Sequence, residues 1–376
     1  MAAPRMGGVQ DQFVFTLKVL RTPTAYMEQQ PKILLEVLHD PDRLGRVRLE
    51  DWNVLIPQAR ATGLMGRLAM QAESLPETLI PTQVRWHLEA SRVIATTHAA
   101  SVKWETVLID RILAGLGIPV VLLKGPAYML LGLPQGRGRI CQDIDLLVSR
   151  DHLAEVERCL LANGWDMNTI EPRQERYFRK WLHELPAMTH RERGTKVDVH
   201  HNILPGIDTI RIEAGMLIAA SSPLDGYRCL RVLAPDDMLL HSAAHLFRRG
   251  LYKNGLRDLV DMDGLLRTYD SDADWDRLLK RAADLRLGEP LFLAIRYTQR
   301  FLGTPVMGEV IRNVRKWRPF WPPLPVLDRL IRVAVLPPSR DGRNGFRTMV
   351  HWLLARYPLS LMRKTILPKL EALRFN

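Results

Sequence analysis

The chain has 376 residues, 47% of them hydrophobic, so it can bury a sizeable core and is long enough for two or three domains. No apolar run approaches the roughly 18 residues of a membrane-spanning helix, and we find no apolar segment followed by a secretory cleavage site near the start. Three cysteines, Cys141, Cys159 and Cys229, without CxxC spacing favour reduced thiols in a cytoplasm over disulfides or a zinc site.

The net charge of +12 is concentrated in one segment. Residues 312–376 hold 14 Lys/Arg against 3 Asp/Glu, a difference of +11, so the preceding residues are nearly neutral. The pI of the whole chain is therefore no argument for a nucleic-acid-binding protein. Trp and Arg interleaved with apolar helices in this segment suit an anionic membrane surface, an RNA backbone or an acidic protein partner. A helical cap with solvated arginines remains an equal alternative.

Helical and strand patterns divide the chain into five parts. Apolar residues recur at three- and four-residue steps before Gly117, as in Ile33, Leu34, Val37 and Leu38, which predicts amphipathic helices. The predicted parts are a flexible N-terminus (1–25), an N-terminal helical module (26–117), a core with strands (118–234), a C-terminal helical domain (235–305) and a basic, Pro/Trp-containing helical tail (306–376).

The core contains two short apolar runs that we predict to be buried strands, Val120 to Leu123 and Leu146 to Val148, the second preceded by Asp143-Ile144-Asp145. Residues i and i+2 of a strand point to the same face, so Asp143 and Asp145 project together. Two carboxylates about 4 Å apart repel by roughly 4 kcal/mol at an effective dielectric near 20. This pair favours a divalent cation between them, and oxygen ligands suit Mg²⁺. The alternative is an exposed strand end with two solvated aspartates.

A possible phosphate site lies between these strands. Lys124 and Gly125 precede a short predicted helix that begins with Pro126 and ends before Gly132. Free backbone N–H groups at a helix start attract phosphate, and Lys124 would add a positive charge. We interpret residues 135–139 as a mobile loop that delivers Arg139 towards phosphates. For Lys124 and Gly125, the alternative is an ordinary strand-to-helix turn without a phosphate.

A third predicted strand contains Asp198 and His200, which alternate with Val197 and Val199 and therefore share a face. If this strand lies beside the one that follows Asp143, a third carboxylate joins the pair. Three carboxylates with two metal ions are the set that in-line nucleotidyl transfer uses.

A helical pattern resumes at Pro235. His241 and His245 are four residues apart on one predicted helix face, but a catalytic zinc site would need a third ligand and the Glu of an HExxH motif, which is absent. On a later predicted helix we interpret three acidic residues as a polar face in preference to a second metal site: Asp258, Asp261 and Asp263.

These motifs together resemble the uncharacterised bacterial nucleotidyltransferases of the polymerase-β-like superfamily. The resemblance rests on Leu-Leu-Lys124-Gly125, on Arg139-x-x-x-Asp143-Ile-Asp145-Leu-Leu-Val and on Val-Asp198-Val-His200. It extends from about Trp52 to Leu266 and includes Leu240-His241-Ser-Ala-Ala-His245-Leu and Leu256-Arg257-Asp258-Leu259. Lys124-Gly125 stands where the wider superfamily carries a Gly-Ser pair.

The resemblance implies roles for the individual residues. Asp143 and Asp145 match the family's paired metal carboxylates, and Asp198 matches its third acidic position. His245 is implied to line the nucleotide or acceptor cleft. Arg257, with Asp258, is implied to orient nearby groups.

The combined expectation is an α+β protein with a small mixed β-sheet core flanked by N- and C-terminal helical modules. Its expected activity is Mg²⁺-dependent transfer of NMP from an NTP such as ATP to an unidentified acceptor hydroxyl or phosphate, with two ions on Asp143, Asp145 and Asp198. Lys124, Gly125 and Arg139 are expected to hold the triphosphate. We expect a cytoplasmic location, with the inner membrane surface as an alternative. A non-catalytic nucleotide-binding or antitoxin-like regulator, and a peripheral membrane or scaffold protein, remain alternative functions.

Overall fold

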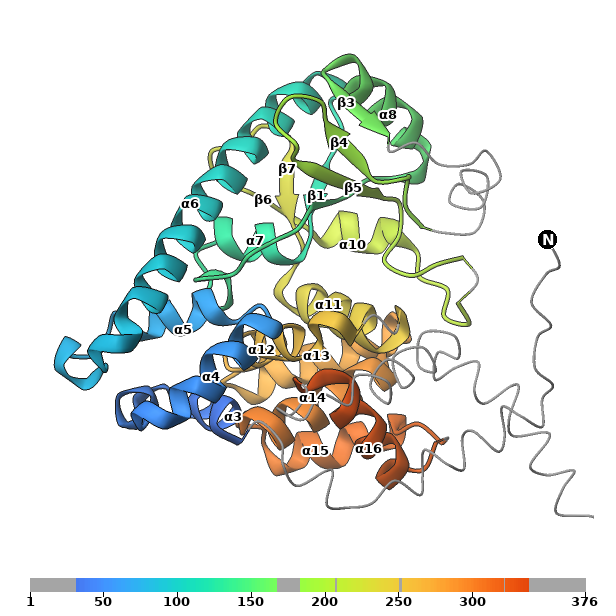
Figure 1. The fold of residues 1–376 in the computed structure, drawn as a ribbon. Helices are drawn as coiled ribbons and strands as arrows, with labels where there is room; N and C mark the ends of the chain where they lie inside the picture. Colours follow the sequence, from blue (N-terminus) through green and yellow to red (C-terminus); the bar gives the residue numbers. More distant parts are fainter. Residues whose placement is uncertain (1–31, 168–182, 207, 250–251, 321, 338–376) are drawn as a thin grey trace, which may run out of the picture.

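The computed structural model describes residues 32–167, 183–206, 208–249, 252–320 and 322–337, and it contains two lobes (Figure 1). One lobe is built around a β-sheet, and the other consists of helices (Figure 1). The long helix α6 (Thr82–Leu113) runs along both. The predicted α+β class with a mixed sheet is confirmed.

The described residues form a seven-stranded sheet in the order β3-β4-β5-β2-β1-β7-β6. The strands are β1 (Val120–Leu122), β2 (Ile144–Leu147), β3 (Trp165–Met167), β4 (Met188–His190), β5 (Lys196–His200), β6 (Ser222–Pro223) and β7 (Leu230–Val232). The pairs β2·β5 and β1·β7 are parallel, whereas β1·β2, β3·β4, β4·β5 and β6·β7 are antiparallel. The central strands β1 and β2 are buried along their whole length, which explains why β1 is entirely apolar and β2 is apolar except for Asp145.

Short helices connect the strands. They are α7 (Lys124–Leu130), α8 (Leu153–Ala162) and α10 (Ala214–Ala220). Helix α6 packs against α8 and ends in a short 3₁₀ turn. Gly117 closes this turn in the left-handed region, with φ of 64°, a conformation that glycine adopts without strain.

The helical lobe combines both ends of the described chain. Its N-terminal helices are α3 (Lys32–His39), α4 (Leu49–Ala61) and α5 (Met65–Ala72). Its C-terminal helices are α11 (Pro235–Arg249), α12 (Gly255–Leu266), α13 (Asp272–Asp284), α14 (Gly288–Leu302), α15 (Gly308–Val314) and α16 (Leu324–Val335). Helix α3 packs against α14, so the two helical modules predicted separately meet in one lobe (Figure 1).

A hydrophobic core extends through both lobes. Leu146 in the sheet, Leu240 in α11 and Leu291 in α14 are all fully buried. Within the described ranges, none of the helices combines the length and apolar character required to cross a membrane.

The basic tail is described only at its start. Helix α16 buries Leu327, Ile331 and Val335 against the rest of the lobe, so this part of the tail is packed helix. The predicted flexible residues 1–25, and residues 338–376 of the tail, lie outside the described residues.

Candidate active site

Strand pairing brings the three predicted carboxylates together. In the parallel pair of β2 and β5, Asp145 stands directly opposite Asp198, and Asp143 lies two residues before Asp145. The conditional prediction that these strands are neighbours is therefore confirmed. Asp145 is only 6% exposed, and its two flanking residues Ile144 and Leu146 are buried in the core. The alternative of two solvated aspartates at a strand end is thus excluded for Asp145.

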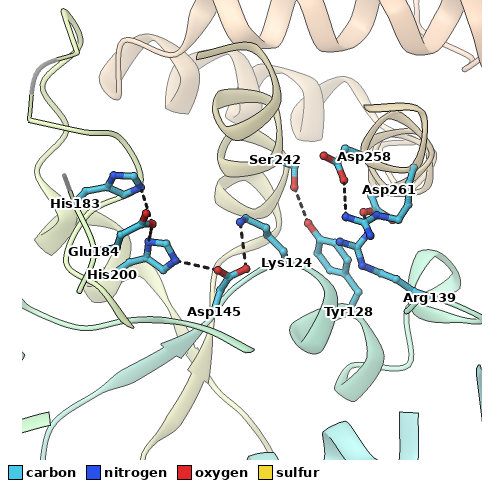
Figure 2. A network of polar contacts seen from close by, with 11 residues as sticks. Lys124, Tyr128, Arg139, Asp145, His183, Glu184, His200, Ser242, Asp258 and Asp261 are labelled. Carbon is cyan, nitrogen blue, oxygen red and sulfur yellow. Dashed lines mark hydrogen bonds and ion pairs between the residues drawn. The ribbon is translucent and has the colours of Figure 1, made fainter. Parts of the chain in front are cut away.

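Asp145 is held between two cationic side chains. Its Oδ2 accepts a hydrogen bond from Lys124 Nζ at 3.1 Å, and its Oδ1 lies 2.9 Å from His200 Nε2 (Figure 2). Burial alone would raise the pKa of the Asp145 carboxyl, but the ammonium and the imidazole outweigh it and hold this pKa well below its ordinary value. Asp145 is therefore ionised over the whole physiological pH range.

The other two carboxylates have too little positive charge around them. Burial and then the charge of Asp145 raise the pKa of Asp143. Burial, then Asp145 and Asp143, raise the pKa of Asp198 to about 7. Asp198 Oδ1 is buried and has no hydrogen-bond partner among the described residues. Additional positive charge, which a cation would supply, would stabilise the ionised forms of Asp143 and Asp198.

His200 links Asp145 to a second acidic residue. Its Nδ1 lies 3.1 Å from Glu184 Oε2, and Glu184 pairs with His200 through an isolated antiparallel bridge (Figure 2). Burial would lower the pKa of His200, but its hydrogen bonds to Asp145 and Glu184 raise it to about 9. His200 is therefore an imidazolium at neutral pH and fixes the orientation of the Asp145 carboxylate.

His183 extends this row, with Nε2 3.8 Å from Glu184 Oε2. One potential ligand atom from each of His183, Glu184 and His200 lies within 4.8 Å of the others, so the three could also hold a metal ion. For that, Nδ1 of His200 would have to give up the proton that it shares with Glu184. In the structure, His200 Nδ1 is instead at hydrogen-bonding distance from Glu184.

The turn from β1 into α7 positions Lys124. Leu123 is extended, and Lys124 begins the helix with φ of 49°, a left-handed conformation that is costly for a residue other than glycine. This backbone directs the Lys124 side chain to Asp145. A Cβ on Gly125 would collide with Cys141 Sγ and with the guanidinium of Arg139. Gly125 is thus required for packing between α7 and the segment that precedes β2.

Helix α11 places two histidines and a serine beside this site. His241 is 3% exposed, and burial, followed by the positive charge of Lys124, holds its pKa well below the ordinary value. His245 is close enough to Asp145 to contribute to the lowered pKa of that carboxyl. Ser242 Oγ is 2.7 Å from the hydroxyl of Tyr128 in α7 (Figure 2). The predicted helix therefore borders the carboxylate site, with His241 as a neutral buried residue.

The family assignment follows from a match over most of the chain. Residues 48–303 match a family model described as "Uncharacterised nucleotidyltransferase". The chain belongs to this nucleotidyltransferase family. No curated protein matches it. A crystal structure of an antigenic nucleotidyltransferase-like protein from Paracoccidioides brasiliensis matches with 15% identity and a TM-score of 0.31, over 56% of this chain and 95% of that chain. That likeness is too weak to inform the fold.

In this family member Arg139 is buried and Arg257 is partly buried. Arg139 is 7% exposed, pairs with Asp261 of α12, and lies over the Tyr128 ring at 5.9 Å (Figure 2). Arg257 contacts Asp258 at 3.3 Å and the Ile140 carbonyl at 3.4 Å. Arg139 is therefore not in an open loop, and both guanidinium groups have partners within the protein.

The interpretation of the α12 acidic residues as a polar face is wrong. Asp258, Asp261 and Asp263 are 9%, 4% and 6% exposed. Asp263 accepts hydrogen bonds from Arg267 and from the hydroxyl of Thr304. These aspartates are buried because each has a cationic partner, which balances the cost of removing a carboxylate from water.

Sequence reasoning missed Glu184 and His183. They follow a segment without regular periodicity, and no motif connects Glu184 to His200 in the sequence. Only the backbone pairing reveals the link, because Leu185 N–H donates to the Val199 carbonyl at 2.8 Å and so sets Glu184 beside His200.

Proposed function

We propose that this family member transfers a nucleotidyl group from an NTP to an acceptor in a Mg²⁺-dependent reaction. The observation that carries the proposal is the cross-strand pair Asp145–Asp198, with Asp143 directly before β2 and two residues from Asp145. In the reaction, an acceptor heteroatom forms a bond to the α-phosphorus of the NTP. The bond from this phosphorus to the β-phosphate oxygen breaks, and pyrophosphate leaves.

The donor set fits magnesium. Asp143, Asp145 and Asp198 offer carboxylate oxygens, the ligands that hard divalent cations prefer. The buried Asp198 Oδ1 that has no partner among the described residues, and the raised pKa of Asp198, fit a set of ligands for a cation. When bound, two Mg²⁺ ions would lower the pKa of the attacking hydroxyl and neutralise charge on the leaving pyrophosphate.

The remaining roles belong to side chains of the chain itself. Lys124 pairs with Asp145 inside the carboxylate site, so we assign its positive charge to the triphosphate, where a lysine acts as a point charge. Asp198 completes the carboxylate set and assists removal of the acceptor proton. His200, fixed by Glu184, holds Asp145 in one orientation. Contacts of Gly125, Arg139, His245 and Arg257 with nucleotide stay predictions, and the internal ion pair of Arg139 counts against it.

The test is pyrophosphate release from each of the four NTPs with Mg²⁺, in a cell extract that supplies acceptors. We expect release by the wild type and loss of at least about a hundredfold in Asp145→Asn, because a charged metal ligand is removed. Asp166→Asn is the matched control. Asp166 lies on β3 of the same sheet, and its half-exposed side chain pairs with Arg191. Its substitution should leave the rate unchanged.

A second readout separates loss of activity from loss of fold. Mg²⁺ with NTP should raise the melting temperature of the wild type and of Asp166→Asn, and should leave that of Asp145→Asn unchanged. If NTP stabilises the wild type but no pyrophosphate appears with any of the four, the chain is a nucleotide-binding regulator and the catalytic proposal is wrong.

A further inference from the structure

Helix α6 carries apolar residues on two opposite faces. The inner face packs into the core, and its buried apolar residues are Val84, Leu88, Ala95, Val102 and Ile109. The outer face lies along the left edge of the molecule in Figure 1, and its large apolar side chains, each 49–62% exposed, are Trp86, Val93, Ile94 and Trp104. Single exposed apolar residues are normal, but a row of them on one helix marks an interaction surface.

The outer residues have the spacing of a coiled-coil seam. Steps of four and three residues alternate along an outer seam of six exposed residues, which are Trp86, Ala90, Val93, Thr97, Ala100 and Trp104. This alternation keeps one narrow stripe on the helix, and it is the spacing with which the side chains of two helices interdigitate. From Trp86 to Trp104 the helix rises about 27 Å. The outer seam is therefore long enough to pair with a second helix.

The order of large and small side chains in the outer seam is nearly the same in both chain directions. Reversal about Ala95 exchanges the members of three pairs, which are Trp86 with Trp104, Ala90 with Ala100, and Val93 with Thr97. A twofold axis at right angles to the helix and level with Ala95 would set each residue opposite one of the same or similar size in a second copy. An interface between identical copies requires this self-complementarity, whereas a foreign partner does not.

The residues on either side of the outer seam are also complementary across such an axis. Glu89 and Lys103 are exposed on the same flank, seven residues to each side of Thr96. In an antiparallel pair, Glu89 and the partner's Lys103 would differ by only about 3 Å in height along the helix axis. A parallel pair would instead place Glu89 beside the partner's Ile94. The charges therefore favour the antiparallel arrangement, in which this pair of opposite charges occurs twice.

We propose that the chain forms an antiparallel homodimer in which the outer seams of two α6 helices pack about a twofold axis level with Ala95. Trp86 packs against the partner's Trp104 at each end, and the small residues between them let the helices approach to about 8 Å. On the other flank, Ile94 packs beside the partner's Ile94.

The exposed area indicates a weak dimer. Trp86 and Trp104 are 62% and 55% exposed, so together they supply roughly 200–300 Å² of buried surface from each copy. A standard interface buries about 800 Å² on each partner. Even with the smaller seam residues and the flanks included, the interface is at the low end of this range. We expect a Kd for the dimer on the order of 1–100 µM.

Sedimentation equilibrium of the full chain up to about 200 µM measures this Kd. Val93→Glu should raise it at least about a hundredfold, because it places two unpaired carboxylates beside the axis in an interface that excludes water. Leu49→Glu is the matched control. Leu49 is 47% exposed, close to the 49% of Val93, but it lies in α4 outside the outer seam, so its substitution should leave the Kd unchanged.

Charge reversal tests the antiparallel arrangement itself. Glu89→Lys and Lys103→Glu should each raise the Kd roughly tenfold, because both symmetric pairs then join like charges. The double variant restores opposite charges and should return the Kd to within about threefold of the wild-type value. An equimolar mixture of the two single variants should form mostly heterodimers, because one variant is positive at both positions and the other is negative at both.

Two results would overturn the homodimer. The first is a wild type that stays monomeric at about 200 µM. If this monomer binds vesicles of phosphatidylglycerol and Val93→Glu abolishes that binding, the outer face of α6 is a lipid-binding surface instead. The second is a dimer whose Kd is the same in Val93→Glu, because its interface would then lie elsewhere. None of these measurements depends on pyrophosphate release, so their outcome is independent of the proposed function.

Discussion

At the scale of single residues, the site is a row of alternating charges. Lys124, Asp145, His200 and Glu184 follow one another with contacts of 3.1, 2.9 and 3.1 Å. Each ion in such a row stabilises the charged form of its neighbours, and burial strengthens the interaction because little water screens it. Among the described residues, Asp143 and Asp198 have no comparable cationic neighbour. Their negative charges are therefore the ones that a bound cation would compensate.

This row predicts a pH dependence of stability that belongs to His200. Its pKa is about 9 in the folded protein against 6.5 ordinarily. Because the pKa of His200 is raised in the folded state, protonated His200 stabilises the folded protein fully below pH 6.5. This stabilisation is lost as the pH rises through about 9. The advantage of the wild type over His200→Gln in unfolding free energy should shrink by an amount on the order of 3 kcal/mol between pH 6 and pH 9.

Urea unfolding of both proteins at the two pH values measures this difference. His152→Gln is the control, since His152 pairs with Glu155 at a position where both side chains are about half exposed. The unfolding free energy of His152→Gln relative to the wild type should change by less than about 0.5 kcal/mol between pH 6 and pH 9. A wild-type advantage over His200→Gln that stays constant from pH 6 to pH 9 would contradict the prediction.

At the scale of elements, the sequence predicted what depends on local pattern. The period of two residues in β2 and β5 set Asp145 and Asp198 on matching faces, and the register of the two strands brought them together. The contacts of Arg139 could not be predicted in this way. Its partner Asp261 is 122 residues away on a helix whose own pattern gave no sign of burial. The pairing of Glu184 with His200 could not be predicted either, because it joins a segment without periodicity to a regular strand.

The packing of α7 gives a prediction at this scale. Gly125→Ala should destabilise the protein by about 1–3 kcal/mol, because its Cβ would overlap Cys141 and Arg139 in a closed interface. Gly115→Ala is the matched control, since a Cβ there meets no atom within 4 Å and its backbone lies outside the left-handed region. Thermal unfolding of the two variants checks the difference, and equal melting temperatures would refute it.

At the scale of the whole molecule, buried ion pairs connect the sheet lobe to the helical lobe. Arg139 precedes β2, whereas Asp261 lies in α12 of the helical lobe, and both side chains are at most 7% exposed. Gly138, next to Arg139, has φ of 73° and sits against the backbone of Gly66 in α5, with no room for a side chain. The position of the carboxylates relative to α11 therefore depends on contacts between lobes.

Arg139→Met should destabilise the protein by about 3–5 kcal/mol, because it leaves the Asp261 carboxylate buried without its partner. The double variant Arg139→Met, Asp261→Leu should recover most of this loss, because no unpaired charge remains. Urea unfolding of the single and double variants measures the recovery. A double variant as unstable as the single one would show that shape, and not charge, dominates this contact.

The packing of α3 against α14 has a consequence for how the chain folds during synthesis. Leu34 and Val37 of α3 are completely or almost completely buried, yet α14 ends at Leu302, some 260 residues after α3. At roughly 5–20 residues per second, a ribosome needs on the order of 10–50 s to deliver that partner. The surface of α3 that packs against α14 is therefore uncovered while the sheet lobe emerges. Transiently exposed apolar surface of this kind makes a nascent chain prone to aggregation.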